Sequence, residues 1–362
     1  MIKVLHVFAG MNKGGVESFV LNLHKALKDS DIRFDFLLRS SNGNRTMVQY
    51  FKNSGSRIYV TKSWPLHVFQ NYIQMKRFFI KHAGIYDFIH IHMNSLMYML
   101  PVTMADRYMP DTRIIIHSHN TKVRYFSAMP LHYINRRILK RYRTISLACS
   151  HEAGKWMFTG RYTVVPNGID VSRFQAEPGF RTDSDTLQLV SVGKIENQKN
   201  YIFMLSVIKA LKAEGVKVRY RIAGEGSLKK EFIKAVRTYG LSAEVKLLGN
   251  IESVERLLRE SHIFMMPSKY EGLGIALLEA QCSGIACVIS DRIPRESAVC
   301  PNVYRIPLQK DQWVRTVKNI AAMEDTGYCK TNSKRMAESR YSLKGLALSM
   351  QDIYQTERNV KW

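Results

Sequence analysis

The sequence predicts an α/β protein with two domains, each built on a parallel β-sheet covered by helices. Three observations predict this fold class. Short apolar runs alternate with helix-like stretches, the alternation occurs in two successive sets, and a stretch rich in turn-forming residues separates the sets. The length of 362 residues leaves room for two hydrophobic cores.

The expected strands are the apolar runs of four to seven residues. In the first set we expect them at residues 3–8, 34–39, 57–61, 87–92, 113–117, 144–149 and 162–166. In the second set we expect them at residues 187–192, 217–223, 244–248, 263–267, 286–290 and 303–306. Repeated alternation of strands and helices is typical of Rossmann-like domains. We place the junction within residues 167–185, where turn formers are frequent and periodicity is weak.

Composition limits the class of protein. The formal charge is +24 and is uneven, because residues 1–165 hold 24 Lys and Arg against 8 Asp and Glu. This excess indicates an anionic partner, which could be nucleic acid, an acidic membrane surface or a phosphorylated substrate. Five scattered cysteines without a Cys-x-x-Cys pair argue against a zinc site or a disulfide framework and favour a reducing cytoplasm. Because no apolar run approaches 18 residues, we expect no transmembrane helix, and the N-terminus lacks a signal-peptide core.

The stretch Phe264–Ser290 holds the clearest candidate site. It predicts a strand ending near Pro267, a polar loop, a helix over residues 275–282 that stops at Gly284, and a second strand. The start of this helix would lie at the carboxyl ends of parallel strands. Its free N–H groups and its dipole suit a phosphate, and Gly272 and Gly274 let a ligand approach the backbone.

Two glutamates flank this predicted phosphate site. Glu271 lies just before the helix and Glu279 about one turn inside it. An ionised carboxylate only accepts hydrogen bonds, so both suit sugar hydroxyls rather than phosphate. One could hold a hexose and the other a ribose. The alternative is that Glu271 is a loop charge and Glu279 a solvated helix residue.

Histidines end two of the expected strands. His90 and His92 fit a structural role, and His117 and His119 stand at the end of the next expected strand. No carboxylate or cysteine stands at ligand spacing beside the four histidines, so we expect no metal there.

Residues 122–143 hold seven basic residues interleaved with aromatic and aliphatic ones. This pattern is typical of a membrane-interface segment with basic headgroup contacts, and it would also suit nucleic acid or a solvated helix. For a membrane or acceptor contact the candidates are Arg136, Arg137, Lys140 and Arg141.

The Glu-x7-Glu pattern within YEGLGIALLEA resembles the signature of retaining GT-B glycosyltransferases of family 4, and among these the bacterial exopolysaccharide and capsular polysaccharide enzymes. The resemblance implies two Rossmann-like domains facing a central cleft. It assigns residues 1–170 to the acceptor and 171–340 to the donor, and it lets the amphipathic C-terminal helix, about residues 341–362, cross back to the first domain. Two departures are Leu273, where the family usually has Phe, and Lys194, where it usually has Arg.

The resemblance also implies the site residues. A strand-end histidine, His117 or His119, together with Lys199 and Glu271, would serve catalysis. The donor would contact glycine turns, two lysines, a base-contacting turn and the helix start: Gly14, Gly15, Gly193, Lys194, Lys199, Gly224, Asn250, Ile251, Glu271, Gly272, Leu273, Gly274, Ile275 and Glu279.

We therefore expect a hexosyltransferase that acts with retention, takes its sugar from a nucleotide diphosphate sugar such as a UDP-sugar, and passes it to a saccharide or a lipid-linked saccharide. Two Asp-Ser-Asp matches, at residues 29–31 and 183–185, fall outside the expected site, so we expect no metal cofactor. We expect a cytoplasmic protein attached to the inner face of the plasma membrane, with no nucleic-acid partner. The alternatives are a nucleotide-sugar epimerase of the same fold and a basic nucleic-acid-binding protein.

Overall fold

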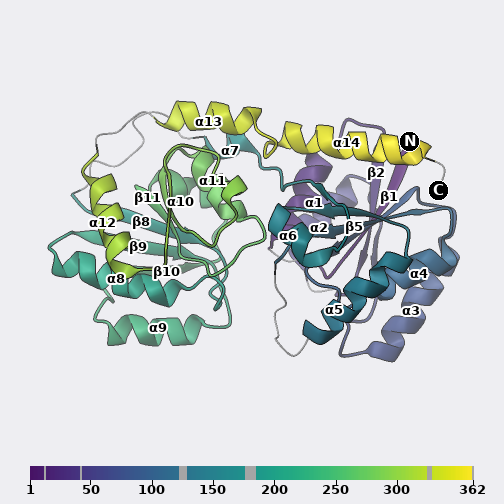
Figure 1. Cartoon of the computed structure of the whole chain (residues 1–362), viewed down its shortest axis with the longest axis horizontal. Helices are drawn as coiled ribbons and strands as arrows, with labels where there is room; N and C mark the ends of the chain where they lie inside the picture. The colour runs from purple at the N-terminus through teal and green to yellow at the C-terminus, as the bar shows by residue number, and fades with distance from the viewer. Residues whose placement is uncertain (12–13, 41–42, 122–128, 176–184, 324–327, 361–362) are drawn as a thin grey trace. The chain divides into compact units, whose positions relative to one another are not determined.

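The structure is a computed structural model, and it describes residues 1–11, 14–40, 43–121, 129–175, 185–323 and 328–360. The chain forms two compact units (Figure 1). Unit 1 comprises Met1–Gly168 and Leu343–Trp362, and unit 2 comprises Ile169–Ser342. The first part of the basic segment, residues 122–128, and part of the predicted junction, residues 176–184, lie outside the described residues.

Unit 1 is built on a seven-stranded parallel sheet of order β3-β2-β1-β4-β5-β6-β7. Its strands are β1 (Ile2–Phe8), β2 (Ile32–Leu38), β3 (Ile58–Val60), β4 (Phe88–Met93), β5 (Arg113–Ser118), β6 (Thr144–Ala148) and β7 (Thr163–Val164). The central strands are almost wholly buried because helices cover both faces. This burial explains why their sequences are mainly apolar, although His6 interrupts β1 and His90 and His92 interrupt β4.

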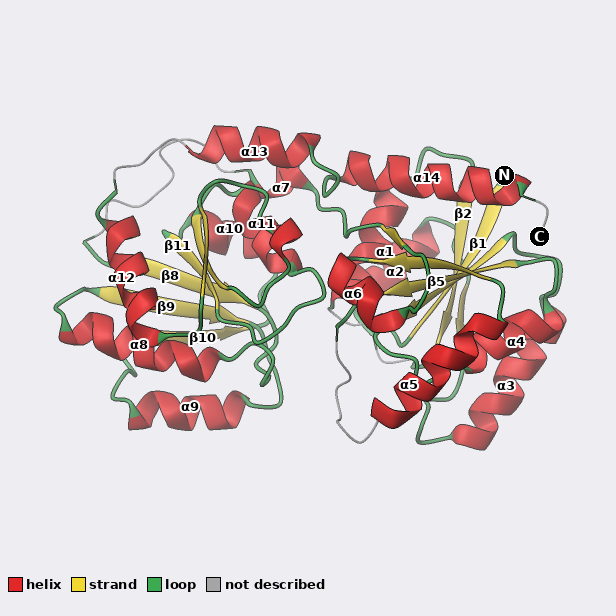
Figure 2. Ribbon diagram, viewed as in Figure 1, coloured by secondary structure: helices red, strands yellow, loops and turns green. Residues whose placement is uncertain are grey.

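The helices of unit 1 form one layer on each face of this sheet (Figure 2). One layer consists of α1 (Gly15–Ala26), α2 (Arg45–Asn53) and α14 (Leu343–Asn359), and the other of α3 (Val68–Lys81), α4 (Leu100–Tyr108) and α5 (Met129–Ile138). The short helices η2 (Leu139–Arg141) and α6 (His151–Met157) flank β6.

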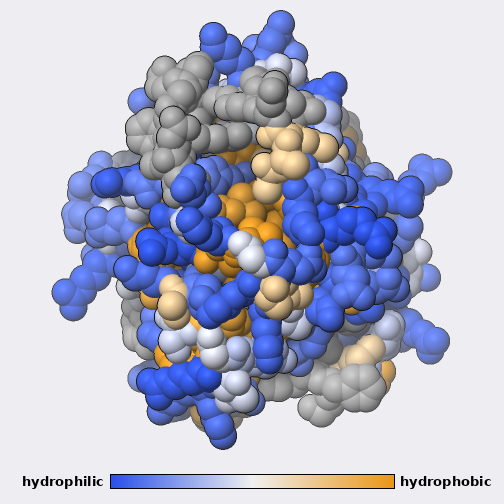
Figure 3. Space-filling view, turned by 90° about the vertical axis from the view of Figure 1, so that its left-hand side faces the viewer, coloured by the Kyte–Doolittle hydropathy of each residue, from blue (hydrophilic) through white to orange (hydrophobic). Residues whose placement is uncertain are grey.

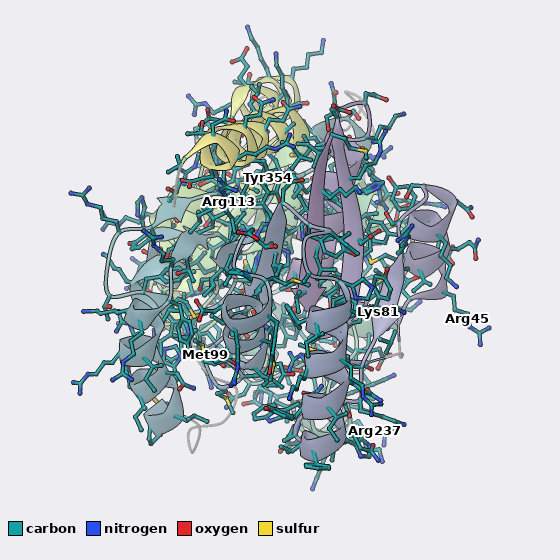
Figure 4. The ribbon with its side chains drawn as sticks, turned by 90° about the vertical axis from the view of Figure 1, so that its right-hand side faces the viewer. Arg45, Lys81, Met99, Arg113, Arg237 and Tyr354 are labelled. Atoms are coloured by element: carbon teal, nitrogen blue, oxygen red, sulfur yellow. The ribbon has the colours of Figure 1, made fainter. Side chains whose placement is uncertain are left out.

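The C-terminal helix α14 packs into the core of unit 1. Leu346, Met350 and Tyr354 are buried with the strands, and Figure 4 shows Tyr354 and Arg113 beneath this helix. The Arg113 guanidinium, from the start of β5, donates to the carbonyls of Arg358 and Val360, both at 2.8 Å. A cation that satisfies the last carbonyls of a helix stabilises its C-terminus.

Unit 2 is built on a six-stranded parallel sheet of order β10-β9-β8-β11-β12-β13. Its strands are β8 (Leu187–Val192), β9 (Val218–Ala223), β10 (Val245–Gly249), β11 (Ile263–Met266), β12 (Ala286–Ser290) and β13 (Val303–Ile306). On one face the core joins α8 (Tyr201–Ala213), α9 (Lys229–Thr238) and α12 (Lys310–Ala321) to the sheet. The remaining helices are α7 (Val171–Phe174), α10 (Val254–Arg259), α11 (Ile275–Cys282), η3 (Arg295–Ser297) and α13 (Tyr328–Glu338). The face drawn in Figure 3 is mainly hydrophilic, with hydrophobic residues gathered near its middle.

The thirteen predicted strands are confirmed, with ends that differ by at most two residues. The helix predicted over residues 275–282 is confirmed as α11, and the predicted C-terminal helix as α14. Within the described part of the chain, no helix combines the length and the apolar character needed to cross a bilayer.

Candidate functional site

The helix α11 begins at a turn that brings backbone N–H groups to the carboxyl edge of the unit 2 sheet. Gly274 caps it with φ of 85°, and a Cβ there would lie 3.2 Å from the terminal methyl of Met266. Glycine is therefore favoured by both backbone conformation and space. Leu277 and Leu278 are fully buried and anchor the helix. The Leu277 and Leu278 N–H groups donate to the Gly274 carbonyl at 2.9 and 3.4 Å, so the N–H groups of Ile275 and Ala276 are the ones that this turn can offer to an anion.

A buried ion pair stands beside this turn. The Lys199 ammonium donates to Oε1 of Glu271 at 2.8 Å, and the two side chains are only 17% and 8% exposed. The Gln198 side-chain amide donates to the other carboxylate oxygen at 3.3 Å and to the Tyr270 carbonyl at 3.0 Å. These contacts join the loop before α8 to the loop before α11, which are 72 residues apart in sequence. They fix the position of a cation at this edge of the sheet.

Glycines make room for this arrangement. A Cβ on Gly193 would lie 2.8 Å from Cε of Lys199, and one on Gly224 would lie 2.0 Å from the carbonyl oxygen of Gly193. Both have positive φ, of 145° and 147°. The Gly193 and Gly224 N–H groups donate to the carbonyls of Ala223 and Gly249 at 2.9 and 2.7 Å. The ends of β8, β9 and β10 are thus packed backbone to backbone, which a side chain would prevent.

Glu279 lies one turn into α11. Burial raises the pKa of its carboxyl to about 7; the nearby charge of Glu255 also raises this pKa, whereas those of Arg173 and Lys199 lower it. A carboxyl with this pKa is about half ionised at neutral pH. In its ionised form, the Glu279 carboxylate can accept a hydrogen bond from a ligand hydroxyl.

The other residues predicted to contact the donor differ in their burial. Gly272 and Leu273 are buried in the turn and Ile275 is half-buried, whereas the side chains of Lys194 and Asn250 are exposed. Ile251 is half-buried after β10. The structure therefore brings Gly193, Gly224, Lys199 and Glu271 together with the start of α11, and it leaves the ammonium of Lys194 in solvent.

Gly14 and Gly15 belong to unit 1 and begin α1. Gly14 has an extended backbone with φ of −164°, and the Gly15 carbonyl accepts a hydrogen bond from the Asn167 amide at 3.1 Å. The position at a helix N-terminus agrees with the sequence-based expectation. Their contact with a donor diphosphate remains a prediction.

The two candidate strand-end histidines differ in their free nitrogens. His117 is fully buried, with Nε2 3.2 Å from the Val165 carbonyl and Nδ1 3.3 Å from His90 Nε2, so both ring nitrogens are used. His119 is half-buried, shares one hydrogen bond with His92 at 2.9 Å, and keeps Nδ1 without a partner. Only His119 therefore has a ring nitrogen left for a ligand.

The four basic residues predicted to contact a membrane or an acceptor differ in their exposure. Arg137, Lys140 and Arg141 are exposed. Arg136 is half-buried, and its guanidinium donates to the carbonyls of Lys155, at 2.6 Å, and Phe158. Arg136 thus ties α5 to α6 and is less available to an external anion.

Three residues of these sites were missed by sequence reasoning. Gln198 holds Glu271, Arg173 acts on Glu279, and His6 joins the other strand-end histidines. Gln198 directly precedes Lys199 and His6 lies within the first strand, so sequence position alone offered a weak signal. Two triads of histidines have ring nitrogens within 4.8 Å of one another: the buried His6, His90 and His92, and the buried His92 and His117 with the half-buried His119. The expectation that no metal binds remains a prediction.

Comparisons with known proteins show the family of this chain. Residues 173–340 match the family Glycosyl transferases group 1, and residues 13–173 match Glycosyltransferase Family 4. The glycosyltransferase EpsF of Bacillus subtilis is 31% identical over 345 residues, which cover 88% of each chain. The chain belongs to the family 4 glycosyltransferases.

Other relatives of this glycosyltransferase extend the comparison. The capsular polysaccharide biosynthesis glycosyltransferase CapH of Staphylococcus aureus is 25% identical and covers 88% of this chain and 91% of its own. The UDP-Gal:α-D-GlcNAc-diphosphoundecaprenol α-1,3-galactosyltransferase of Escherichia coli is 23% identical over 57% of this chain and 58% of its own. The structure of Anabaena HepE in complex with UDP and glucose superimposes with a TM-score of 0.80 at 14% identity, covering 98% of this chain and all of HepE. The fold is therefore the GT-B fold of two Rossmann-like domains.

Proposed function

We propose that this glycosyltransferase transfers a hexose from a UDP-sugar, with retention of anomeric configuration, to a saccharide or lipid-linked saccharide in cell-surface polysaccharide synthesis. Unit 2 would bind the donor and unit 1 the acceptor. The names of CapH and of the E. coli galactosyltransferase, and the UDP and glucose bound in HepE, support this choice of donor and acceptor.

The observation that carries the proposal is the Lys199–Glu271 pair at the glycine-lined start of α11. Negative charge grows on the diphosphate as the glycosidic bond breaks. The Lys199 ammonium and the positive end of α11 would stabilise that charge without reorganisation. The carboxylates of Glu271 and Glu279 would accept hydrogen bonds from hexose and ribose hydroxyls.

A panel of nucleotide sugars tests the donor. We expect UDP-sugars to raise the unfolding temperature more than GDP- or ADP-sugars. Proton NMR of the product, collected before the anomers equilibrate, then gives the stereochemical outcome. A product of inverted configuration would contradict retention, and an epimerised donor without acceptor would favour the epimerase alternative.

We propose that transfer needs no metal ion, because Lys199 and α11 supply the charge that a divalent cation provides elsewhere. Transfer should persist in EDTA. Complete loss in EDTA, restored by Mn²⁺ or Mg²⁺, would contradict this.

We also propose that unit 1 contacts an anionic membrane surface. Large apolar side chains are exposed at the start of α3, with Leu66 81% and Phe69 75% exposed, and further ones on α5, among them Ile134. Residues 36–86 and 112–151 contain no Asp or Glu but hold eight Lys or Arg each. Both helices lie on the same side of the sheet (Figure 1). Apolar side chains beside basic ones suit the boundary between headgroups and acyl chains.

Flotation with vesicles tests this contact. The protein should bind vesicles with 30% phosphatidylglycerol at low salt, and binding should fall after Leu66→Ser with Phe69→Ser, or after charge reversal of Arg137, Lys140 and Arg141. Arg136 is left intact because it holds α6. Charge reversal of three exposed basic residues of α9, Lys230, Lys234 and Arg237, is the matched control. Equal recovery with phosphatidylcholine vesicles would leave a soluble acceptor as the better interpretation.

A further inference from the structure

Five histidines of unit 1 form one buried cluster, which we call the histidine cluster. They come from three adjacent strands and project to one face of the sheet: His6 on β1, His90 and His92 on β4, and His117 and His119 at the end of β5. Phe19 of α1 packs on four of these rings, with centroids 4.7 to 6.3 Å apart. Among the described residues, no carboxylate bonds to any of the five.

The first chain of hydrogen bonds in this cluster has a fixed direction. A carbonyl only accepts, so His117 must donate from Nε2 to Val165. His117 Nδ1 then accepts from His90 Nε2 at 3.3 Å, and His90 Nδ1 accepts from the Tyr354 hydroxyl at 2.9 Å. Both imidazoles are therefore the Nε2–H tautomer. This chain leaves nothing for a ligand.

The second chain runs from His6 through His92 to His119. His6 Nδ1 lies 2.9 Å from His92 Nε2, and His92 Nδ1 lies 2.9 Å from His119 Nε2. Burial keeps these rings neutral by lowering their pKa values. A neutral imidazole has one donor and one acceptor nitrogen, so all three rings must be the Nδ1–H tautomer or all three the Nε2–H tautomer.

The two ends of this second chain are open. His6 Nε2 and His119 Nδ1 are buried and have no partner in the described part of the chain. A buried polar atom without a partner costs stability, and a ligand hydroxyl that bonds to it removes this cost. Of these two nitrogens, His119 Nδ1 lies at the carboxyl edge of the sheet, because His119 directly follows the last residue of β5.

We infer that His6 and His92 are positioning residues for His119: their hydrogen-bond chain holds its ring in one orientation and sets whether Nδ1 meets a sugar hydroxyl as donor or acceptor. The inference rests on the proposed function and on the prediction, implied by the family resemblance, that a histidine at the end of β5 faces the transferred sugar. His6 lies two hydrogen bonds away from that nitrogen. Its replacement should therefore change the reaction without removing a ligand contact.

A metal ion is the competing occupant of the histidine cluster. Zinc binds imidazole nitrogens at about 2.0–2.1 Å, so tetrahedral ligands lie over 3 Å apart. The 2.9 Å spacings instead leave room for one proton between each pair of nitrogens. Of the ten ring nitrogens of the histidine cluster, eight take part in hydrogen bonds among the residues that the structure describes, and only the two chain ends do not. We therefore favour a chain of hydrogen bonds over a metal site.

NMR of the protein with ¹⁵N-labelled histidine tests the chain without any substrate. His90 and His117 should both be the Nε2–H tautomer, and His6, His92 and His119 should share one tautomer. Mixed tautomers among these three would overturn the inference. Stoichiometric zinc, nickel or copper in the purified protein, lost in His92→Phe, would overturn it in favour of a metal site.

Kinetics of variants tests the positioning role. His6→Phe should lower kcat for transfer by on the order of tenfold at unchanged UDP affinity, because second-sphere partners of a functional imidazole contribute at this level. His6→Asn should restore most of kcat, since the Asn amide can bond to His92 from the position of Nδ1. Tyr354→Phe is the matched control, because it removes an equally buried hydrogen bond of the first chain.

Three outcomes of the kinetics would overturn the inference. These are an unchanged kcat in His6→Phe, the same loss in Tyr354→Phe, and no recovery in His6→Asn when the unfolding temperature shows that it is folded. Failure of UDP binding in the parent protein would instead contradict the proposed function, and the tautomer measurement would still stand.

Discussion

At the scale of single residues, the raised pKa of Glu279 connects donor binding to pH. If the carboxylate accepts hydrogen bonds from ribose hydroxyls, the donor binds the ionised form. With a pKa of about 7, roughly a tenth of the free protein is ionised at pH 6 and nine-tenths at pH 8. The affinity for UDP-glucose, which does not titrate in this range, should therefore fall about tenfold from pH 8 to pH 6 in calorimetry.

The variants of Glu279 separate this carboxylate from other groups. Glu279→Gln should flatten the pH dependence, and Glu279→Ala should weaken donor binding on the order of ten- to a hundredfold, because a charge-assisted hydrogen bond contributes about 1.5–3 kcal/mol. A dissociation constant unchanged in Glu279→Ala would remove this residue from the site.

Because Lys199 pairs with the buried Glu271, we expect two effects when Lys199 is replaced. Lys199→Ala leaves the Glu271 carboxylate, only 8% exposed, without its cation, which destabilises the protein by up to about 3 kcal/mol. Transfer should slow more than uridine binding weakens, because the charge on the diphosphate grows during bond breaking. Thermal unfolding and steady-state kinetics measure the two effects.

An exposed lysine of the same loop is the control for stability. Lys194→Ala should leave the unfolding temperature unchanged, since its side chain lies in solvent. Equal losses of uridine and UDP-sugar affinity in Lys199→Ala would argue against a phosphate role for this ammonium.

At the scale of elements, the turn after β8 leaves room for the Lys199 side chain because Gly193 has no side chain. In Gly193→Ala the new methyl would lie 2.8 Å from Lys199 Cε and 3.1 Å from the Tyr201 hydroxyl, so it should push the ammonium away from Glu271. We expect transfer to fall at least tenfold at nearly unchanged uridine affinity.

The control for Gly193→Ala also replaces a glycine of positive φ, but one without close neighbours. Gly240 has φ of 69°, and nothing lies within 4 Å of an added Cβ. Gly240→Ala should cost about 1–2 kcal/mol of stability and leave transfer unchanged. If both variants lose the same activity, strain rather than displacement of Lys199 is the cause.

At the scale of the whole molecule, the histidines make the two units differ in acid stability. Ten of the eleven histidines lie in unit 1, and burial lowers the pKa of His6 and of His117 to about 3. Because the unfolded chain binds these protons near pH 6.5 and the folded unit does not, stability is full above pH 6.5 and falls as pH drops toward 3.

The expected loss is large. Each such histidine contributes up to about 1.4 kcal/mol per pH unit, so four fully buried ones cost several kcal/mol between pH 6 and pH 5. Hydrogen exchange should show unit 1 opening at about pH 5 while unit 2, which holds only His262, stays protected. Simultaneous loss of protection in both units would contradict this account.

The sequence by itself determined the two α/β domains, the thirteen strands and the start of α11, because apolar periodicity and glycine placement act over a few neighbouring residues. It also pointed to Glu271 and Glu279. Only the tertiary structure decided which groups meet: Lys199 with Glu271 across 72 residues, and Arg136 with carbonyls near α6. The tertiary structure also distinguished His119, which has a free ring nitrogen, from His117, which has none. The free nitrogens of an imidazole depend on hydrogen-bond partners from other strands and from α14, and the local sequence does not specify these partners.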